Sequence, residues 1–163
     1  MDLVLNDFVF SALTKKKISL NSSGNAWRPL IDVRDMSRAI IYSIENIHKT
    51  KKGLILNVGS NNSNSKIIDL AKKVAQIIKN TKIEIKEQIN DNRSYKVSFK
   101  KYNKFKNNEF FHHKIKDTIL NLKQNINLLI TKNKNIRFNK FIRLKILEEK
   151  IKSQKLTKNL KWK

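Results

Sequence analysis

The apolar run G-L-I-L-N-V-G, from Gly53 to Gly59, constrains the fold of this 163-residue chain most strongly. A near-continuous apolar run bounded by glycines is typical of a strand buried on both faces, as in a parallel sheet. After a polar loop, apolar residues recur at helical spacing from Ile67 to Ile78, which indicates an amphipathic helix. Strand and helix patterns alternate along the chain, so the sequence predicts an α/β fold.

The remaining segments extend this pattern. Pro29 places the strand over 27–33 at a sheet edge or a strand start, because proline donates no backbone hydrogen bond. Asp35 is expected to cap the helix that runs to about Asn46, and Ser63 or Ser65 the helix that follows the polar loop. Further strands are predicted over 18–20 and 82–88, and further helices over 2–14 and near 98–106, 113–130 and 138–152.

Length and composition exclude several classes of protein. A chain of this length folds by default as one domain with one core. It contains no cysteine, which excludes disulfides, thiolate zinc sites and a cysteine nucleophile. The N-terminus has neither the basic region nor the long apolar core of a signal peptide. No run of about 18 apolar residues predicts a membrane-spanning helix. We therefore expect a cytoplasmic protein without a membrane partner.

The net charge of +23 raises the question of a nucleic-acid partner. However, 30 of the 36 basic residues are lysine and only 6 are arginine, whereas nucleic-acid readers favour the planar arginine fork. Abundant Asn and Ile also fit a codon bias, so nucleic acid is not the expected partner. The charge is uneven, with +7 over residues 1–94 and +16 over residues 95–163.

Three further motifs occur in a fixed order. They are G-N-A-W-R-P-L-I-D-V-R-D at 24–35, N-V-G-S at 57–60 and D-N-R-S-Y-K-V-S at 91–98, and D-L-V-L-N-D at 2–7 precedes them. Together they resemble the substrate-binding half of the NAD-dependent epimerase/dehydratase family, the extended short-chain dehydrogenases that act on nucleotide sugars. Members fold as a Rossmann domain followed by a smaller substrate domain. Met1 stands where the first half of such an enzyme should already have ended.

The resemblance implies a fold and a domain division. The expected fold is α/β, with an incomplete Rossmann-type parallel sheet remnant, a small substrate domain and C-terminal helices. Residues 1–106 correspond to the substrate-binding part. Residues 107–163 form a basic helical extension, whose end resembles the C-terminal extension of one subgroup of the family.

The resemblance also implies the site residues. Asn6 matches an asparagine that hydrogen-bonds the substrate diphosphate, and Arg28 and Arg93 match two arginines near the same diphosphate. An amide can donate to a phosphate oxygen, and a guanidinium can bind phosphate through two parallel hydrogen bonds. Two departures affect the expected pocket: Ser22-Ser23-Gly24 replaces the usual Gly-Asp-Gly, and Asp32 stands where the family usually has histidine.

No catalytic, cofactor-binding or metal-binding residue is assigned. The family uses NAD, but only three glycines are present and G-x-x-G-x-x-G does not occur. Tyr102 and Lys106 fit Y-x-x-x-K, but in so lysine-rich a chain this spacing arises by chance and it lies after the substrate motifs. His112 and His113 lack the accompanying carboxylates of a metal site, and His48 lies near a helix end. The resemblance also implies that Asn57 and Gly59 lie near the cofactor–substrate crevice.

The favoured hypothesis is therefore the C-terminal portion of a nucleotide-sugar epimerase/dehydratase, inactive alone. It would bind nucleotide sugar and pair with a missing N-terminal half or a full-length paralogue. Two alternatives stay open at this point: a basic nucleic-acid-binding module, and an assembly partner of an intact epimerase.

Overall fold

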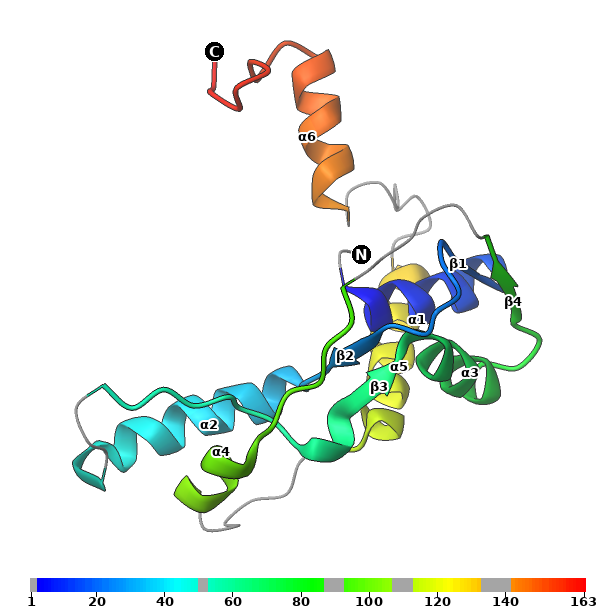
Figure 1. Cartoon of the computed structure of the whole chain (residues 1–163). Helices are drawn as coiled ribbons and strands as arrows, with labels where there is room; N and C mark the ends of the chain where they lie inside the picture. The colour runs from blue at the N-terminus through cyan, green and yellow to red at the C-terminus, as the bar shows by residue number, and fades with distance from the viewer. Residues whose placement is uncertain (1–2, 50–52, 87–92, 107–112, 133–141) are drawn as a thin grey trace.

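The computed structural model describes residues 3–49, 53–86, 93–106, 113–132 and 142–163 (Figure 1). Its helices and strands, in chain order, are α1 (Val4–Lys15), β1 (Lys17–Leu20), β2 (Trp27–Pro29), α2 (Val33–Glu45), β3 (Asn64–Lys66), α3 (Ile67–Ile77), β4 (Lys82–Ile85), α4 (Lys100–Phe105), α5 (Ile115–Lys132) and α6 (Arg143–Lys152). Short 3₁₀ turns lie at Ile47–Lys49 and Asn61–Ser63.

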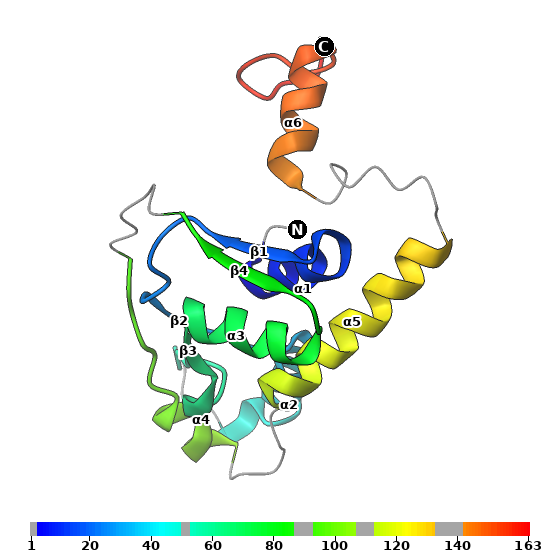
Figure 2. The same cartoon turned by 90° about the vertical axis from the view of Figure 1, so that its right-hand side faces the viewer.

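The main core lies among α1, α3 and α5, beside the parallel pair β1 and β4 (Figure 2). Helix α3 contributes Leu70, Ala71 and Val74 to this core, which is the apolar stripe that the sequence predicts. Ile18 and Leu20 of β1 are buried in the same cluster. Because β1 and β4 run parallel and helices pack against them, the α/β expectation is confirmed.

A second, antiparallel pair joins β2 to β3, with Trp27 opposite Lys66 and Pro29 opposite Asn64. This pair extends away from the main core toward α2 and α4 (Figure 1). Strand β2 ends at Pro29, so the predicted strand over 27–33 is shorter than expected. Pro29 does lie on an edge of a two-stranded pair, as its missing N–H requires.

The expected buried strand over 53–59 is wrong. These residues are extended but form no ladder with any described residue, and Ile55 is 84% exposed. A strand needs neighbouring strands that supply its hydrogen bonds, and none of the described strands reaches this segment. The sequence pattern shows that the segment is apolar, but it does not show whether neighbouring strands are present to pair with it.

Two expected helix caps are also wrong. Asp32, not Asp35, caps α2, because its Oδ1 accepts a hydrogen bond from the backbone N–H of Arg34 at 3.0 Å. Asp35 lies inside the first turn and is buried. Neither Ser63 nor Ser65 caps α3, which starts after Lys66 without a side-chain cap. Ser65 lies within β3 opposite Arg28, and Lys66 stands at the N-cap position.

Helix α5 belongs to the main core, where Ile119 and Ile126 pack with α1 and α3 residues. Helix α6 and the residues after it stand apart from the rest in both views (Figures 1 and 2). Leu156 and Trp162 form a single bridge within that C-terminal segment, and the Lys150 ammonium lies 4.3 Å from the Trp162 ring centroid. The domain boundary at residue 106 stays a prediction.

Candidate functional site

A cavity of about 630 Å³ lies between the start of α1, strand β2 and the extended residues 93–95. All three residues that the resemblance assigns to diphosphate contacts line it: Asn6, Arg28 and Arg93. Its apolar wall includes Leu3, Leu30, Ile31 and Ile67. The structure thus brings together residues that lie up to 87 positions apart in the sequence, although the role of each stays a prediction.

Two hydrogen bonds explain why residues 93–95 lie beside β2. The Trp27 N–H donates to Ser94 Oγ at 3.1 Å, and the Tyr95 N–H donates to the Trp27 carbonyl at 3.3 Å. These bonds hold the third motif against the first across a long stretch of chain. The first and third motifs, which are far apart in the sequence, therefore lie side by side in the fold.

The Arg28 guanidinium is held in place at the cavity wall. Its Nη1 donates to the Trp27 carbonyl at 2.8 Å and to the Arg93 carbonyl. Its Cζ lies 5.4 Å from the centroid of the Tyr95 ring, within reach of a cation–π interaction. A guanidinium fixed in this way is positioned before any anion arrives, which lowers the entropy lost on binding.

Asn6 lies in the first turn of α1, and the cavity borders the N-terminal end of that helix through Leu3, Val4 and Leu5. Helix N-termini carry unpaired N–H groups and the positive end of the helix dipole. An anion in the cavity would therefore meet this helix end on one side and the Arg28 and Arg93 side chains on the other.

Sequence reasoning missed Tyr95 and the aromatic–cation cluster at the cavity rim. The Lys96 ammonium lies 3.8 Å from the Trp27 ring centroid, and that of Lys66 lies 5.8 Å from it. The available signal was local: Tyr95 stands two residues after Arg93 and is flanked by Lys96. Only the fold shows that the Arg28 guanidinium lies over the Tyr95 ring.

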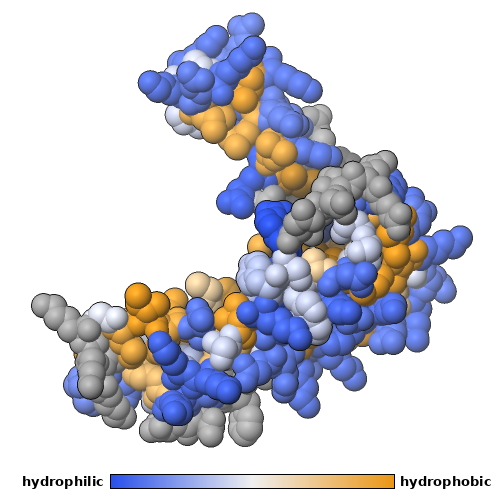
Figure 3. Space-filling view, in the orientation of Figure 1, coloured by the Kyte–Doolittle hydropathy of each residue, from blue (hydrophilic) through white to orange (hydrophobic). Residues whose placement is uncertain are grey.

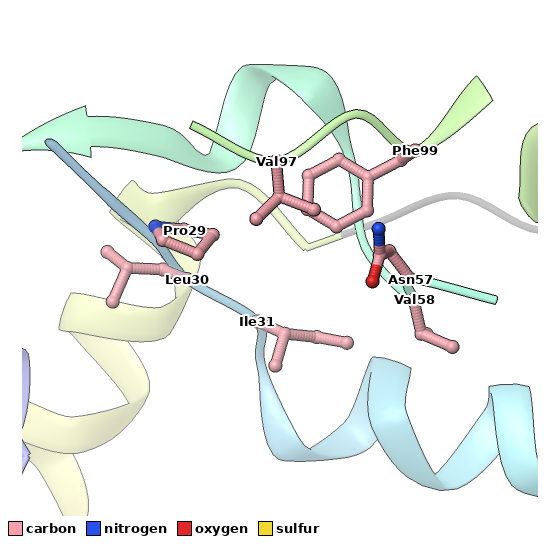
Figure 4. Close-up of a pocket in the computed structure, with 7 residues that line it drawn as sticks. All are labelled: Pro29, Leu30, Ile31, Asn57, Val58, Val97 and Phe99. Atoms are coloured by element: carbon pink, nitrogen blue, oxygen red, sulfur yellow. The ribbon is translucent and has the colours of Figure 1, made fainter. Parts of the chain in front are cut away.

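A second cavity, of about 220 Å³, shares Pro29, Leu30 and Ile31 with the first (Figure 4). Asn57 and Val58 line it from one side and Val97 and Phe99 from the other. Asn57 thus lines a cavity next to the candidate site, but it lies in an extended segment and not at the end of a strand.

Gly59 beside this second cavity is required by packing. Its φ is +151°, and a Cβ there would lie 2.7 Å from the Phe99 ring. Gly24 is similar, with φ +74° and a Cβ position 2.9 Å from Ile68. Both glycines face packed side chains, so neither offers an open backbone to a pyrophosphate.

Two carboxylates at the start of α2 contact residues in and just before the first turn of α5. Asp32 accepts from Arg34 Nε at 2.9 Å, from Arg34 Nη2 at 2.8 Å and from Thr118 Oγ1 at 2.6 Å. Asp35 accepts from the His113 backbone N–H at 2.8 Å and contacts His113 Nδ1 at 2.7 Å. The role of both residues in this structure is to join α2 to α5.

Asp32 should make stability depend on pH. The side-chain hydrogen bonds from Arg34 hold the pKa of Asp32 far below its ordinary 3.8, against an opposing effect of burial, and the hydrogen bond from Thr118 lowers the pKa further. A lowered folded-state pKa contributes stability above the unfolded pKa and loses it as the pH falls. We expect Asp32→Asn to lower the free energy of unfolding at pH 7, with the difference from wild type shrinking between about pH 5 and pH 2.

Chemical denaturation at several pH values measures this difference. Asp69→Asn, at an exposed carboxylate in the first turn of α3, is the matched control and should show a smaller effect. A wild-type advantage over Asp32→Asn that stays constant down to pH 2 would contradict the assignment.

Tyr102 and Lys106 do not resemble a tyrosine–lysine catalytic pair. Both are buried, and burial, with smaller effects from Asp35 and Tyr42, raises the pKa of the Tyr102 hydroxyl to about 12. A catalytic tyrosine base needs a pKa lowered toward neutrality, so this environment acts in the wrong direction.

No metal-binding group of three or more His, Cys, Asp or Glu residues occurs in the described part of the chain. His113 is engaged with Asp35, His48 is exposed, and His112 lies outside the described residues. Across the described ranges, no helix is both long and apolar enough to cross a membrane.

Comparison with known proteins places these observations in context. Residues 2–59 match the model of the NAD dependent epimerase/dehydratase family. No curated protein sequence matches the chain. Among solved structures, one similar protein is described as a novel NAD dependent NDP-hexosamine 5,6-dehydratase, TunA, involved in tunicamycin biosynthesis.

That similarity concerns the fold alone, at 11% sequence identity and a TM-score of 0.64. It covers 78% of this chain but 41% of the dehydratase, so the chain spans about two fifths of that protein's length. The matched residues 2–59 include α1, Arg28 and the whole of α2. Over residues 2–59 the chain thus resembles this family in sequence, and over 78% of its length it resembles a dehydratase in fold.

Proposed function

We propose that this chain is the substrate-binding portion of a nucleotide-sugar epimerase/dehydratase, which binds the diphosphate of a nucleotide sugar and performs no turnover alone. The observation that carries the proposal is the convergence of Asn6, Arg28 and Arg93 on one cavity. The family match and the fold of a dehydratase named for an NDP-hexosamine support the substrate class.

The chemistry of the cavity suits a diphosphate linked to a less polar group. Two guanidinium-bearing residues, an amide and a helix N-terminus can neutralise and hydrogen-bond the phosphates. The apolar wall around Leu30 and Ile31 and the exposed Tyr95 ring offer contact surface to the remainder of the ligand.

The proposal also assigns cofactor binding to a region outside the described residues. NAD would supply hydride transfer in the whole enzyme. The packed surroundings of Gly24 and Gly59 and the raised pKa of Tyr102 support placing both the NAD cradle and the catalytic base outside the described residues. The described residues would bind and orient the nucleotide sugar, while the reaction would also require the cofactor-binding region.

Calorimetric titration of the purified chain with nucleotide sugars, and separately with NAD, tests the proposal. We expect saturable binding of at least one nucleotide sugar, no binding of NAD, and no epimerase or dehydratase turnover when both are supplied. Turnover by the isolated chain, or NAD binding without nucleotide-sugar binding, would contradict the proposal.

A further inference from the structure

Residues 143–163, which we call the C-terminal module, are held together by contacts within the module. After α6 the chain turns back, and the Leu156 N–H donates to the Lys150 carbonyl at 3.2 Å. A tight turn then brings Trp162 beside Leu156, with which it forms a β-bridge, and the Trp162 ring lies over the Lys150 ammonium. No described residue of the main core comes from this module, which stands apart from that core (Figures 1 and 2).

An apolar surface runs along the C-terminal module. Leu144, Leu147 and Ile151 of α6 are spaced three and four residues apart, so they share one helix face. Leu147 also lies one turn before Lys150, and the Trp162 ring over Lys150 therefore borders the same face. Leu144 is 64% exposed and Trp162 is 69% exposed. Figure 3 shows, at its top, an apolar stripe along this module with hydrophilic side chains on both sides.

Leu160 adds an apolar side chain to the turn of the module. Its φ is +58°, a left-handed conformation that glycine or asparagine adopts more easily than leucine. The Leu160 side chain is exposed, so packing within the module does not compensate for this backbone. A bulky apolar residue at such a position points to a role in contact with a partner.

The same module is strongly basic. Residues 143–163 contain seven lysines, one arginine and two glutamates, which give a net charge of +6. Lys161 and Lys163 flank Trp162 directly in the sequence. Exposed apolar side chains are therefore surrounded by positive charge, and the partner that complements both is anionic around an apolar interior.

The composition of the module favours a lipid surface over a macromolecule. Protein interfaces are depleted in lysine, and nucleic-acid readers favour arginine, whereas seven of the eight cations here are lysines. A bilayer with anionic lipids attracts any positive charge near its surface, and tryptophan is enriched at the level of the lipid headgroups. A short helix that lies in the plane of this surface does not need the length of a membrane-spanning helix.

We infer that the C-terminal module binds the surface of anionic phospholipid bilayers. Leu144, Leu160 and Trp162 enter the headgroup region, and the surrounding lysines lie against the lipid phosphates. The inference goes beyond the proposed function and does not rest on it. The module contributes no residue to the candidate cavity, so the lipid surface and the cavity are separate sites on this chain.

Flotation of the full chain with vesicles tests the inference first. We expect binding to vesicles of phosphatidylcholine and phosphatidylserine at about three to one, and at least 10-fold weaker binding to phosphatidylcholine alone. Raising the salt from about 0.15 M to about 1 M should also weaken binding at least 10-fold, because the charges are screened. Absence of binding to the anionic vesicles, or equal binding to both kinds of vesicle, would overturn the inference.

A charge-neutral double variant then tests the contact surface. Leu144→Asn/Leu160→Asn should bind the anionic vesicles at least about 10-fold more weakly, because two apolar side chains no longer leave water. Both leucines are exposed and asparagine tolerates the backbone of Leu160, so the module should fold. Leu128→Asn/Leu129→Asn makes the same change at exposed positions of α5 and should stay within about threefold of wild type. Equal affinities for the two double variants would show binding through general charge and overturn the inference.

Trp162 itself reports insertion in a Trp27→Phe background. Its fluorescence should shift to shorter wavelength when the anionic vesicles are added, because the ring moves from water into the headgroup region. Vesicle binding without this shift would overturn the inference. Double-stranded DNA is the competing anion: DNA binding that is lost in Leu144→Asn/Leu160→Asn would assign the surface to nucleic acid and also overturn it.

Discussion

Replacing Arg28 with alanine should weaken the binding of nucleoside diphosphate by about 10- to 100-fold, because a hydrogen bond to a charged group contributes about 1.5–3 kcal/mol. The guanidinium is already held at the cavity wall by the Trp27 and Arg93 carbonyls, so it loses little freedom on binding. Titration calorimetry with UDP, GDP, CDP and dTDP, using whichever binds wild type most tightly, measures the change.

The chain's high positive charge calls for a charge-matched control. Arg143→Ala removes the same side chain from α6, which contributes no residue to the candidate cavity. We expect this variant to change affinity by less than about threefold at 0.15 M salt, where distant charges are screened. Equal weakening by Arg28→Ala and Arg143→Ala would show that the diphosphate binds through general charge and not in the cavity.

Replacing Ile119 with alanine should lower the free energy of unfolding by about 2–5 kcal/mol, the usual cost of removing a large aliphatic side chain from a core. Ile119 is fully buried and packs with residues of α1 and α3. The loss should appear in the unfolding of the whole body, because α5 shares that core. Trp27 fluorescence, in a Trp162→Phe background, reports this transition in a denaturant titration.

The Ile119 variant also tests the division of the chain at residue 106. A boundary there would make residues 107–163 a separate unit, and Ile119→Ala would then leave the Trp27 transition unchanged. Leu144→Ala, at an exposed position of α6, is the control and should shift the midpoint little. Lack of any effect of Ile119→Ala on the Trp27 transition would contradict a core shared by α1, α3 and α5.

Local patterns predicted the elements that are stabilised by their own amphipathic faces. The stripe of α3 from Leu70 to Val74 is buried in the core as its spacing indicates. The predicted strand over 53–59 was wrong for a different reason. Its apolar residues favour burial, but the hydrogen bonds of a strand depend on neighbouring strands elsewhere in the fold.

The α2 cap shows a second limit of sequence reasoning. Asp32 and Asp35 are separated by two residues, and either is an acceptable N-cap by residue type. Tertiary contacts decide between them, because Asp35 accepts a hydrogen bond from His113, which lies 78 residues away in the chain. In the candidate site, the ordered motifs were enough to predict Asn6, Arg28 and Arg93 as diphosphate contacts. The contact of Arg28 with Tyr95 depends on residues 93–95 lying beside β2, which no local sequence pattern encodes.

The crystal structure of the chain with a bound nucleotide sugar is the most direct test of the account. We predict that the diphosphate lies within hydrogen-bonding distance of Arg28, Arg93 and Asn6, in the cavity at the start of α1. A diphosphate seated elsewhere on the basic surface, with this cavity empty at saturating ligand, would contradict it.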